Sequence, residues 1–360
     1  MGLEIEGHEV LFQMIATVLK FLIVLVVSVH IPPVMIWVER RAPALMQRRK
    51  GPNRVGLFKW RLWGLLQSLA DAIKLIFKEE NVPENSPSKF FFHFAPILGL
   101  LPALLVISAI PFGPPLRILG QSVSLSVISV NAGFLFIFAI SSLGVYGVCL
   151  AGWASSNKFS LLGSLRASAQ MVSYEIPLGL SLVPVVLLYE SLDLSQIVAG
   201  QSHIFKWGIF LSPVSFVIFL ICMFAETNRP PFDLAEGESE LVAGFHTEYG
   251  SAKFALFYLS EYINMFALSC LCSLLFFGGW QIPFVSTQML QEIFGQNIAA
   301  LIGVGVLVLK SLFFLWLYVW VRWTIPRFRY DQLMGLGWKF LLPLGLANIL
   351  VTALVLSFTF

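Results

Sequence analysis

The sequence predicts an all-α fold: a polytopic membrane protein with about eight transmembrane helices plus an amphipathic helix on the cytoplasmic side. Apolar residues make up 58% of the 360 residues and charged residues only 12%, whereas soluble domains contain roughly 45–50% and about 25%. A soluble globule could not bury so much apolar surface, and disordered chains are polar and highly charged. We therefore interpret residues 1–360 as one membrane domain.

Eight apolar stretches reach the length of about 20 residues that a helix needs to cross a bilayer. They lie near residues 10–37, 90–110, 124–151, 170–190, 207–225, 252–278, 299–321 and 338–358. Glu4, Glu6 and Glu9 precede the first stretch, with no basic segment before it, which is unlike a cleavable signal peptide. We expect this stretch to remain as a membrane span.

The Lys and Arg residues are distributed unevenly between the loops that join these stretches. Nineteen of the 23 lie in or beside alternate loops, whereas only Arg117 and Lys206 lie in the others. Because cytoplasmic loops carry the excess of Lys and Arg, we expect a multi-pass protein of a bacterial inner (plasma) membrane, with both termini on the periplasmic side.

The first cytoplasmic-side loop, 38–89, contains the predicted amphipathic helix. Its apolar positions recur at helical spacing: Leu62, Leu65, Leu66, Leu69, Ile73, Ile76 and Phe77. Its opposite face carries Gln67, Asp71, Lys74 and Lys78. Such a helix lies at the membrane surface or under a partner. A basic loop that only sets topology and attracts anionic lipid is the alternative interpretation.

The second long cytoplasmic-side loop, 226–251, is acidic. Its acids are Glu226, Asp233, Glu236, Glu238, Glu240 and Glu248. We expect their carboxylates to lie close together, so that they raise one another's pKa toward neutrality and exchange protons. A solvated acidic loop with no special chemistry is the alternative.

Four charged residues interrupt the apolar stretches. Glu175 and Glu261 lie within or at the edge of the fourth and sixth spans, and Lys20 and Lys310 lie in the first and seventh. A charge at bilayer depth costs several kcal/mol, so these groups usually face a partner or a water path. The two lysines could instead extend toward the membrane interface.

No motif of a cofactor or metal site occurs in the sequence. Cys149, Cys222, Cys270 and Cys272 all lie in apolar stretches, and Cys270 and Cys272 would point to opposite sides of a helix. The histidines have no ligand spacing, although His246 lies inside the acidic loop. Nucleotide-binding and hydrolytic signatures are also missing, so we expect no cofactor or metal on this chain.

These observations indicate a helical membrane protein that moves protons or binds an amphiphile near its cytoplasmic face. A stand-alone proton-coupled transporter is the default hypothesis for such a chain. Two features oppose it. The halves of the sequence show no matching pair of broken spans, and a transporter does not need two long, oppositely charged loops.

Five sequence blocks, in order along the chain, carry a resemblance to a known family. They are Glu39-Arg40-Arg41 with RKGPNRVG at 49–56, LLQSLADAIKLIFKEE at 65–80, GWASSNKFSLLGSLRASAQMVSYEIPLGL at 152–180, AETNRPPFDLAEGESELVAGFHTEYG at 225–250 and RFRYDQLMGLGWK at 327–339. Together they resemble the membrane heel subunit of proton-pumping NADH:quinone oxidoreductase, respiratory complex I. The resemblance covers essentially the whole chain.

The resemblance implies the membrane subunit that joins a hydrophilic redox arm to the membrane arm and lines a quinone tunnel. The residues it assigns to the tunnel and docking region are Glu39, Arg40, Arg41, Arg54, Asp71 and Lys74. The residues it assigns to an acidic path for protons are Glu175, Glu226, Glu236, Glu238, Glu240, Glu248 and Glu261. Quinone would be the substrate, and FMN and iron–sulfur clusters would belong to partner subunits.

The implied partners are redox-arm subunits on the cytoplasmic side, small membrane subunits, antiporter-like subunits and lipid, without nucleic acid. One departure from the family's pattern is Ala235 with Gly237 around the first acid of the cluster, and the glycine adds backbone freedom. The equivalent subunit of a membrane-bound hydrogenase-type complex, in which no quinone need bind, remains the alternative within this superfamily.

Overall fold

The computed structural model describes residues 2–56, 62–118, 120–285 and 287–359, and most of them are helical. The longer helices are α1 (Gly2–Met46), α3 (Lys89–Ala109), α6 (Lys158–Tyr189), α9 (Pro213–Glu226), α11 (Ser251–Phe276), α13 (Gln296–Thr324) and α15 (Leu342–Thr359). The shorter helices are α2 (Leu66–Phe77), α4 (Gly133–Ser141), α5 (Gly144–Ala154), α7 (Leu194–Gly200), α8 (Gly208–Leu211), α10 (Glu238–Leu241), α12 (Thr287–Phe294) and α14 (Tyr330–Gly335).

A small hairpin and several single turns complete the described structure. Strand β1 (Leu116–Ile118) pairs antiparallel with β2 (Gln121–Val123), with Arg117 opposite Ser122. The single turns are η1 (Leu62–Gly64), η2 (Ile204–Lys206), η3 (Gly244–His246) and η4 (Leu336–Leu341), of which η4 is a π-helical turn between α14 and α15. The predicted all-α fold is confirmed.

Seven of the described helical segments are long and apolar enough to cross a membrane. An eighth apolar helix, α9, is shorter and is preceded by α8. Ser212 between them is non-helical, because the ring of Pro213 disfavours a helical conformation for the preceding residue. The predicted span 207–225 is therefore two helical pieces.

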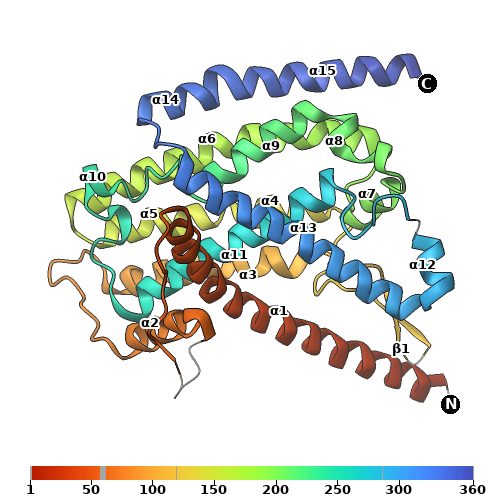
Figure 1. Cartoon of the computed structure of the whole chain (residues 1–360), viewed down its shortest axis with the longest axis horizontal. Helices are drawn as coiled ribbons and strands as arrows, with labels where there is room; N and C mark the ends of the chain where they lie inside the picture. The colour runs from red at the N-terminus through yellow and green to blue at the C-terminus, as the bar shows by residue number, and fades with distance from the viewer. Residues whose placement is uncertain (1, 57–61, 119, 286, 360) are drawn as a thin grey trace.

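Helix α11 lies at the centre of the bundle. In its most apolar stretch 83% of the residues are buried, whereas in α1 only 6% are. Helices α3, α9, α13 and part of α1 pack against α11, and the N-terminal part of α1 and helix α15 lie at the periphery of the bundle (Figure 1). Buried polar groups on α11 are thus shielded from lipid by its neighbours, whereas most of α1 presents apolar side chains to its surroundings.

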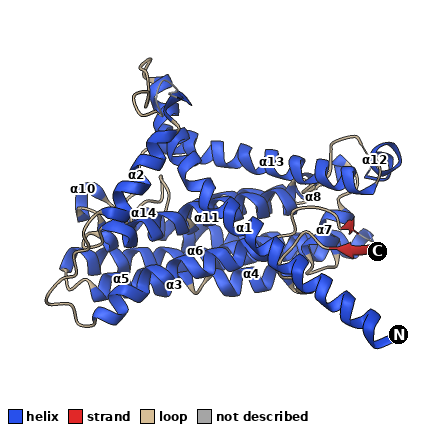
Figure 2. Ribbon diagram, turned by 90° about the horizontal axis from the view of Figure 1, so that it is seen from below, coloured by secondary structure: helices blue, strands red, loops and turns tan. Residues whose placement is uncertain are grey.

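The two ends of the bundle carry different elements. Helices α2 and α10 lie at one end, and α7, α12 and the β-hairpin lie at the other (Figures 1 and 2). Both chain termini lie at the second end, as an even number of crossings requires. The described parts of loops 38–89 and 226–251 both lie at the first end, which we call the loop end.

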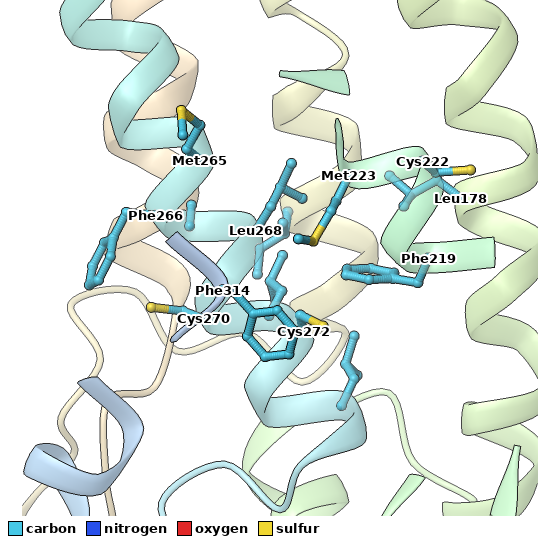
Figure 3. Packing of buried hydrophobic residues seen from close by; sticks show 14 of the residues in the cluster. Leu178, Phe219, Cys222, Met223, Met265, Phe266, Leu268, Cys270, Cys272 and Phe314 are labelled. Atoms are coloured by element: carbon cyan, nitrogen blue, oxygen red, sulfur yellow. The ribbon is translucent and has the colours of Figure 1, made fainter. Parts of the chain in front are cut away.

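Aliphatic, aromatic and sulfur-containing side chains from several helices pack around α11 (Figure 3). Cys270 and Cys272 are fully buried there and point to different sides of the helix. Cys270 accepts a hydrogen bond from Ser311 Oγ on α13 at 3.3 Å. Both cysteines therefore serve in packing, as their place in an apolar stretch predicts.

Helix boundaries differ from the predicted spans at three places. Helix α1 continues to Met46, so Glu39, Arg40 and Arg41 are helical, and the prediction that the loop begins at residue 38 is wrong. Helix α6 begins at Lys158, twelve residues before the predicted span, because Asn157 Oδ1 caps it by accepting from Phe159 N. The third span begins later, at Gly133.

Helices α1 and α6 extend beyond the predicted spans, and the turns outside those spans carry polar side chains. Apolar composition marks only the part of a helix that contacts lipid, and a helix that projects beyond the membrane continues with polar residues. The late start of α4 has a separate cause, because Val127 N and Ile128 N bond to Ser108 O and hold the preceding segment against the end of α3.

Candidate functional site: a buried cluster of acids and arginines

The loop end buries a group of charged residues contributed by four parts of the chain. We call Glu39 of α1, Arg229 of the loop after α9, Glu261 and Tyr262 of α11, and Arg322 of α13 the Arg229 cluster. Glu39, Arg229 and Tyr262 are buried, and Glu261 is mostly so. Charges at such depth persist only when they are paired.

Glu39 receives donors from three elements. Its Oε2 accepts from Arg322 Nη1 at 2.6 Å and from Tyr262 Oη at 2.8 Å. Its Oε1 lies 3.5 Å from Arg229 Nη1. The carboxylate therefore joins α1 to α11 and α13 at the point where α1 leaves the bundle.

Arg229 bridges the two acids of the cluster. Its Nη2 lies 3.2 Å from Glu261 Oε2, and its guanidinium carbon lies 4.4 Å from the centre of the Tyr262 ring. Neither Nη2 nor Nε makes a hydrogen bond of good geometry. Burial opposes the charge of Arg229, but Tyr262, Glu39, Glu261 and Glu236 raise its pKa well above the ordinary value. Arg229 is thus a permanent cation shared between two carboxylates.

Close backbone packing holds the acidic loop on α6. Gly244 has φ of 60°, and a side chain there would overlap the carbonyl oxygen of Ala235. A side chain at Gly163 of α6 would overlap the backbone of Gly244. Ser160 Oγ adds a hydrogen bond to Phe245 O at 2.8 Å. Gly237 also lies in the left-handed region, at φ of 42°, so the loop uses its glycines where other residues would be strained.

Two further acids lie in the same loop. Glu236 Oε1 accepts from Tyr258 Oη of α11 at 3.2 Å and lies 3.8 Å from His246 Nε2. Asp233 pairs with Arg327 at 2.9 Å. Burial, with the charge of Glu236 adding to it, raises the pKa of Asp233 to about 7, although Arg327 acts in the opposite direction. Asp233 therefore gains or loses a proton near neutral pH.

His246 is buried between Glu236 and the aromatic rings of Phe245 and Phe254. Burial lowers its pKa, and Glu236 only partly offsets that effect. A neutral imidazole beside Glu236 follows from this balance. The sequence singles out His246 because it lies inside the acidic loop. The sequence does not predict that this side chain is buried.

The other acids of the loop do not share these partners. Glu240 is exposed and pairs with Arg166 at 2.6 Å, and Glu248 accepts from Asn157 Nδ2 at 2.7 Å. The side chain of Glu238 lies outside the described residues. The expected crowding of the loop carboxylates is therefore wrong for Glu240 and Glu248, because the loop folds over α6 and turns them toward separate partners.

Glu226 and Glu175 form a second pair of acids beside the Arg229 cluster. Glu226 ends α9, is buried, and leaves its Oε2 without a hydrogen-bond partner. The charge of Glu175, on α6, acts on Glu226. Of the predicted acidic path, the structure thus places Glu226 and Glu175 on adjacent helices, and Glu261 in the Arg229 cluster.

The residues assigned to the tunnel region lie around α2. Arg40 Nη1 pairs with Asp71 Oδ2 at 2.7 Å, and Lys74 Nζ lies 4.0 Å from Asp71 Oδ1. Arg41 Nη1 donates to the carbonyl of Trp63 at 2.9 Å, whereas Arg54 is exposed. Glu39, assigned to the same region, turns into the Arg229 cluster instead. Glu39 and Arg40 are consecutive residues of α1, and they thereby connect the Arg229 cluster to α2.

Several members of the site were not candidates in the sequence. Arg229, Tyr262 and Arg322 belong to no recognisable site motif in the sequence, yet they hold Glu39 and Glu261. A partial signal existed for Arg322, which follows directly on the apolar run of the seventh span. Its contact with Glu39 joins residues 283 positions apart, and no local pattern encodes such a pairing.

A metal site has no support in this geometry. Among the described residues, no group of three or more His, Cys, Asp and Glu side chains is arranged to hold an ion. The acids of the Arg229 cluster are instead paired with arginines and a tyrosine, which compensate their buried charges.

Comparisons with known proteins identify the family of this chain. The model of the family described as NADH dehydrogenase matches residues 19–353. The chain belongs to this family. It is 49% identical to an NADH-quinone oxidoreductase subunit from Flavobacterium psychrophilum over 321 residues, which cover 89% of this chain and 91% of that protein.

Other members of the family are similarly close. The corresponding NADH-quinone oxidoreductase subunit from Flavobacterium johnsoniae is 44% identical over 98% of this chain and 97% of its own length. That of Leptospira biflexa is 50% identical over 86% and 85%. Family membership and the long apolar helices together make this chain a multi-pass membrane protein of the NADH dehydrogenase family.

Proposed function

We propose that this chain is the membrane subunit of a proton-translocating NADH:quinone oxidoreductase. In this proposal it forms the quinone entrance and couples quinone reduction to proton movement through its buried acids. The observation that carries the proposal is the Arg229 cluster, in which one buried guanidinium is shared by carboxylates from α1 and α11. An arrangement of this kind responds to any added charge by redistributing protons.

The entrance lies where α1, α2 and α11 meet. The apolar face of α2 is exposed, including Leu69, Ile73 and Phe77, as suits contact with lipid and with an isoprenoid tail that partitions into the bilayer. Arg40 and Asp71 close the polar side of α2 against α1. A quinone headgroup that passes along this side reaches α1 one residue from Glu39.

The electrostatics allow a signal to cross from the entrance to the acids. Two unit charges 4 Å apart interact by about 4 kcal/mol at an effective dielectric of about 20. Negative charge that forms on a reduced quinone near α1 would draw Arg229 or Arg322 away from Glu39. Glu261 and then Glu226 and Glu175 would respond by taking up or releasing protons toward neighbouring membrane subunits.

The proposal assigns the redox chemistry to partners. FMN and iron–sulfur clusters would lie in hydrophilic subunits over the loop end, where the segment 45–50 with Arg48, Arg49 and Lys50 is exposed. Small membrane subunits and antiporter-like subunits would cover α1 and α15, whose outer faces carry many exposed apolar side chains, and lipid would cover the rest.

Purification in mild detergent from native membranes tests this assembly. Flavin and iron should copurify with the tagged chain, together with inhibitor-sensitive NADH:quinone activity. Nickel with hydrogen turnover would point to a hydrogenase-type complex. A chain without partners that still moved protons in vesicles would be a transporter, and either result would contradict the proposal.

A photoreactive quinone tests the entrance in the same preparation. Illumination should label this chain on α1 and α2 near Arg40 and Asp71, and excess unlabelled quinone should prevent the labelling. Labelling confined to α12 or α15, at other surfaces of the bundle, would contradict the assigned entrance.

A further inference from the structure

The buried side-chain amide of one residue on α6 holds the turn between the end of α9 and Arg229. Gln170 lies on α6 and is fully buried. Its Nε2 donates to Ala225 O at 2.7 Å and to Asn228 Oδ1 at 3.1 Å. Its two acceptors lie on either side of Glu226, and the second immediately precedes Arg229.

The backbone of this turn needs such support. At the end of α9, Ala225 O accepts from Asn228 N at a long 3.3 Å, and Gln170 Nε2 adds a shorter bond to it at 2.7 Å. Asn228 has φ of 50°, a left-handed conformation that asparagine tolerates better than most residues. This conformation reverses the chain after α9 and turns Arg229 toward Glu39 and Glu261. A shift in the turn would therefore move Glu226 and Arg229 together.

We propose that Gln170 is a positioning residue for proton transfer. By binding Ala225 O and Asn228 Oδ1, it fixes where Glu226 and Arg229 stand relative to the acids of α1, α6 and α11. This inference rests on the proposed function, because it matters only if those acids carry protons. Gln170 does not contact the quinone entrance around Arg40 and Asp71 in the described structure, so it acts through the turn alone.

The opposite end of the bundle offers a matched control. Gln201 is also fully buried and also binds backbone groups: its Nε2 donates to Leu274 O at 2.8 Å, and its Oε1 accepts from Gly278 N at 2.8 Å. These partners lie at the end remote from the Arg229 cluster. Replacing either glutamine with leucine removes a similar set of buried hydrogen bonds, but only Gln170→Leu disturbs the acids.

The test uses the whole complex in native membrane vesicles, with rates normalised to bound flavin. Gln170→Leu should lower kcat for quinone reduction about tenfold, which corresponds to about 1.4 kcal/mol. KM for a soluble quinone should stay within about twofold, since the entrance is untouched. Gln201→Leu should lower the amount of assembled complex and leave kcat per flavin unchanged.

A second variant keeps the test informative if Gln170→Leu fails to assemble. Asn228→Gly preserves the left-handed backbone, which glycine adopts without strain, but removes one acceptor of Gln170. It should lower kcat in the same direction, by a smaller factor. The double variant should lose less than the product of the two single effects, because both act through one contact.

Glu261→Gln separates failure of this inference from failure of the proposed function. If Glu261→Gln abolishes coupled turnover while Gln170→Leu and Asn228→Gly keep full kcat, Gln170 has only a structural role and the inference is overturned. If Glu261→Gln itself retains full turnover and pumping, the acids do not carry protons and the proposed function falls first.

Discussion

The two ends of the helical bundle bury polar and charged groups in different ways. At the end with α7 and α12, Lys310 Nζ donates to three backbone carbonyls, those of Phe277, Gly279 and Gln281, at 2.7–2.8 Å. It also lies 4.6 Å from the centre of the Trp207 ring. The ammonium has three protons, and backbone groups accept all of them.

At the loop end, charged side chains face one another instead. Arg229 divides its charge between Glu39 and Glu261 with long or poorly aligned contacts, and Glu226 Oε2 has no hydrogen-bond partner. A charge fully bonded to backbone has one stable arrangement. A charge shared between acids has several arrangements of similar energy, which a change in protonation can select. In the proposed function, this difference separates the structural charge of Lys310 from the responsive charges of the Arg229 cluster.

Arg229→Gln should produce the largest effect, because it removes the shared cation. Breaking a buried ion pair by deleting one partner costs about 3–5 kcal/mol of stability. Because the proposed coupling passes through this shared cation, turnover per assembled complex should also fall about a hundredfold, which corresponds to about 2.7 kcal/mol in the activation barrier. Arg229→Lys keeps a charge but cannot span both acids. Its turnover should lie between that of wild type and that of Arg229→Gln. Both rates come from NADH:quinone activity in membranes, normalised to flavin.

If Arg229→Gln and wild type had equal rates, the Arg229 cluster would be as purely structural as the Lys310 site. The two ends of the bundle would then not differ in function.

Lys310→Met should affect stability without affecting chemistry. The variant keeps an unbranched chain but leaves three carbonyls without a donor, at a cost of about 1–3 kcal/mol for a buried unsatisfied group. The midpoint of thermal unfolding of the purified complex should fall, while turnover per flavin stays within about twofold of wild type. Loss of turnover in fully assembled Lys310→Met complex would show that this end also takes part in the reaction.

Asp233→Asn should change how stability depends on pH. The folded protein raises the pKa of Asp233 to about 7 by burial, above the ordinary value of about 3.9. The folded state thus binds this proton more tightly, so the stabilisation is complete below about pH 4 and is lost as pH rises through about 7. Relative to wild type, Asp233→Asn should therefore gain stability as pH rises from about 4 to about 7.

Unfolding midpoints at several pH values, compared between the two proteins, provide this measurement. Parallel curves for wild type and Asp233→Asn would mean that Asp233 does not titrate in this range.

Glu240→Gln should have the smallest effect of the four. Glu240 is 57% exposed and pairs with Arg166, which is itself partly exposed, and such surface pairs contribute about 0.2–1 kcal/mol. Turnover should stay within about twofold of wild type, and the unfolding midpoint should change little. An effect as large as that of Arg229→Gln would extend the functional region beyond the buried cluster to the rim of the acidic loop.

The sequence predicts the fold and part of the site for identifiable physical reasons. Apolar runs mark membrane-spanning helices, and Glu261 stands out because a carboxylate inside such a run is costly. Glu39 gives no such signal, because the polar end of α1 resembles a loop in the sequence. The structure shows that the helix continues to Met46. Gln170 gives no signal, since its role depends on the path of the turn after α9.

The acids of loop 226–251 show the same limit. Their sequence spacing predicts crowding, but the close contact of Gly163 with Gly244 folds the loop over α6 and separates Glu240 and Glu248 from Glu236. Sequence spacing fixes how far apart residues can lie along the chain, and packing decides which of them meet. The same holds for the shared position of Arg229 between α1 and α11.

The central claim is that Glu261 couples quinone reduction to proton movement through Arg229. The most direct test measures proton uptake and NADH:quinone activity together in sealed vesicles that carry Glu261→Gln, with Glu292→Gln on the remote α12 as the control. We predict that the control matches wild type, while Glu261→Gln assembles normally and loses coupled proton movement. Normal pumping at a normal rate in the Glu261→Gln vesicles would contradict the claim.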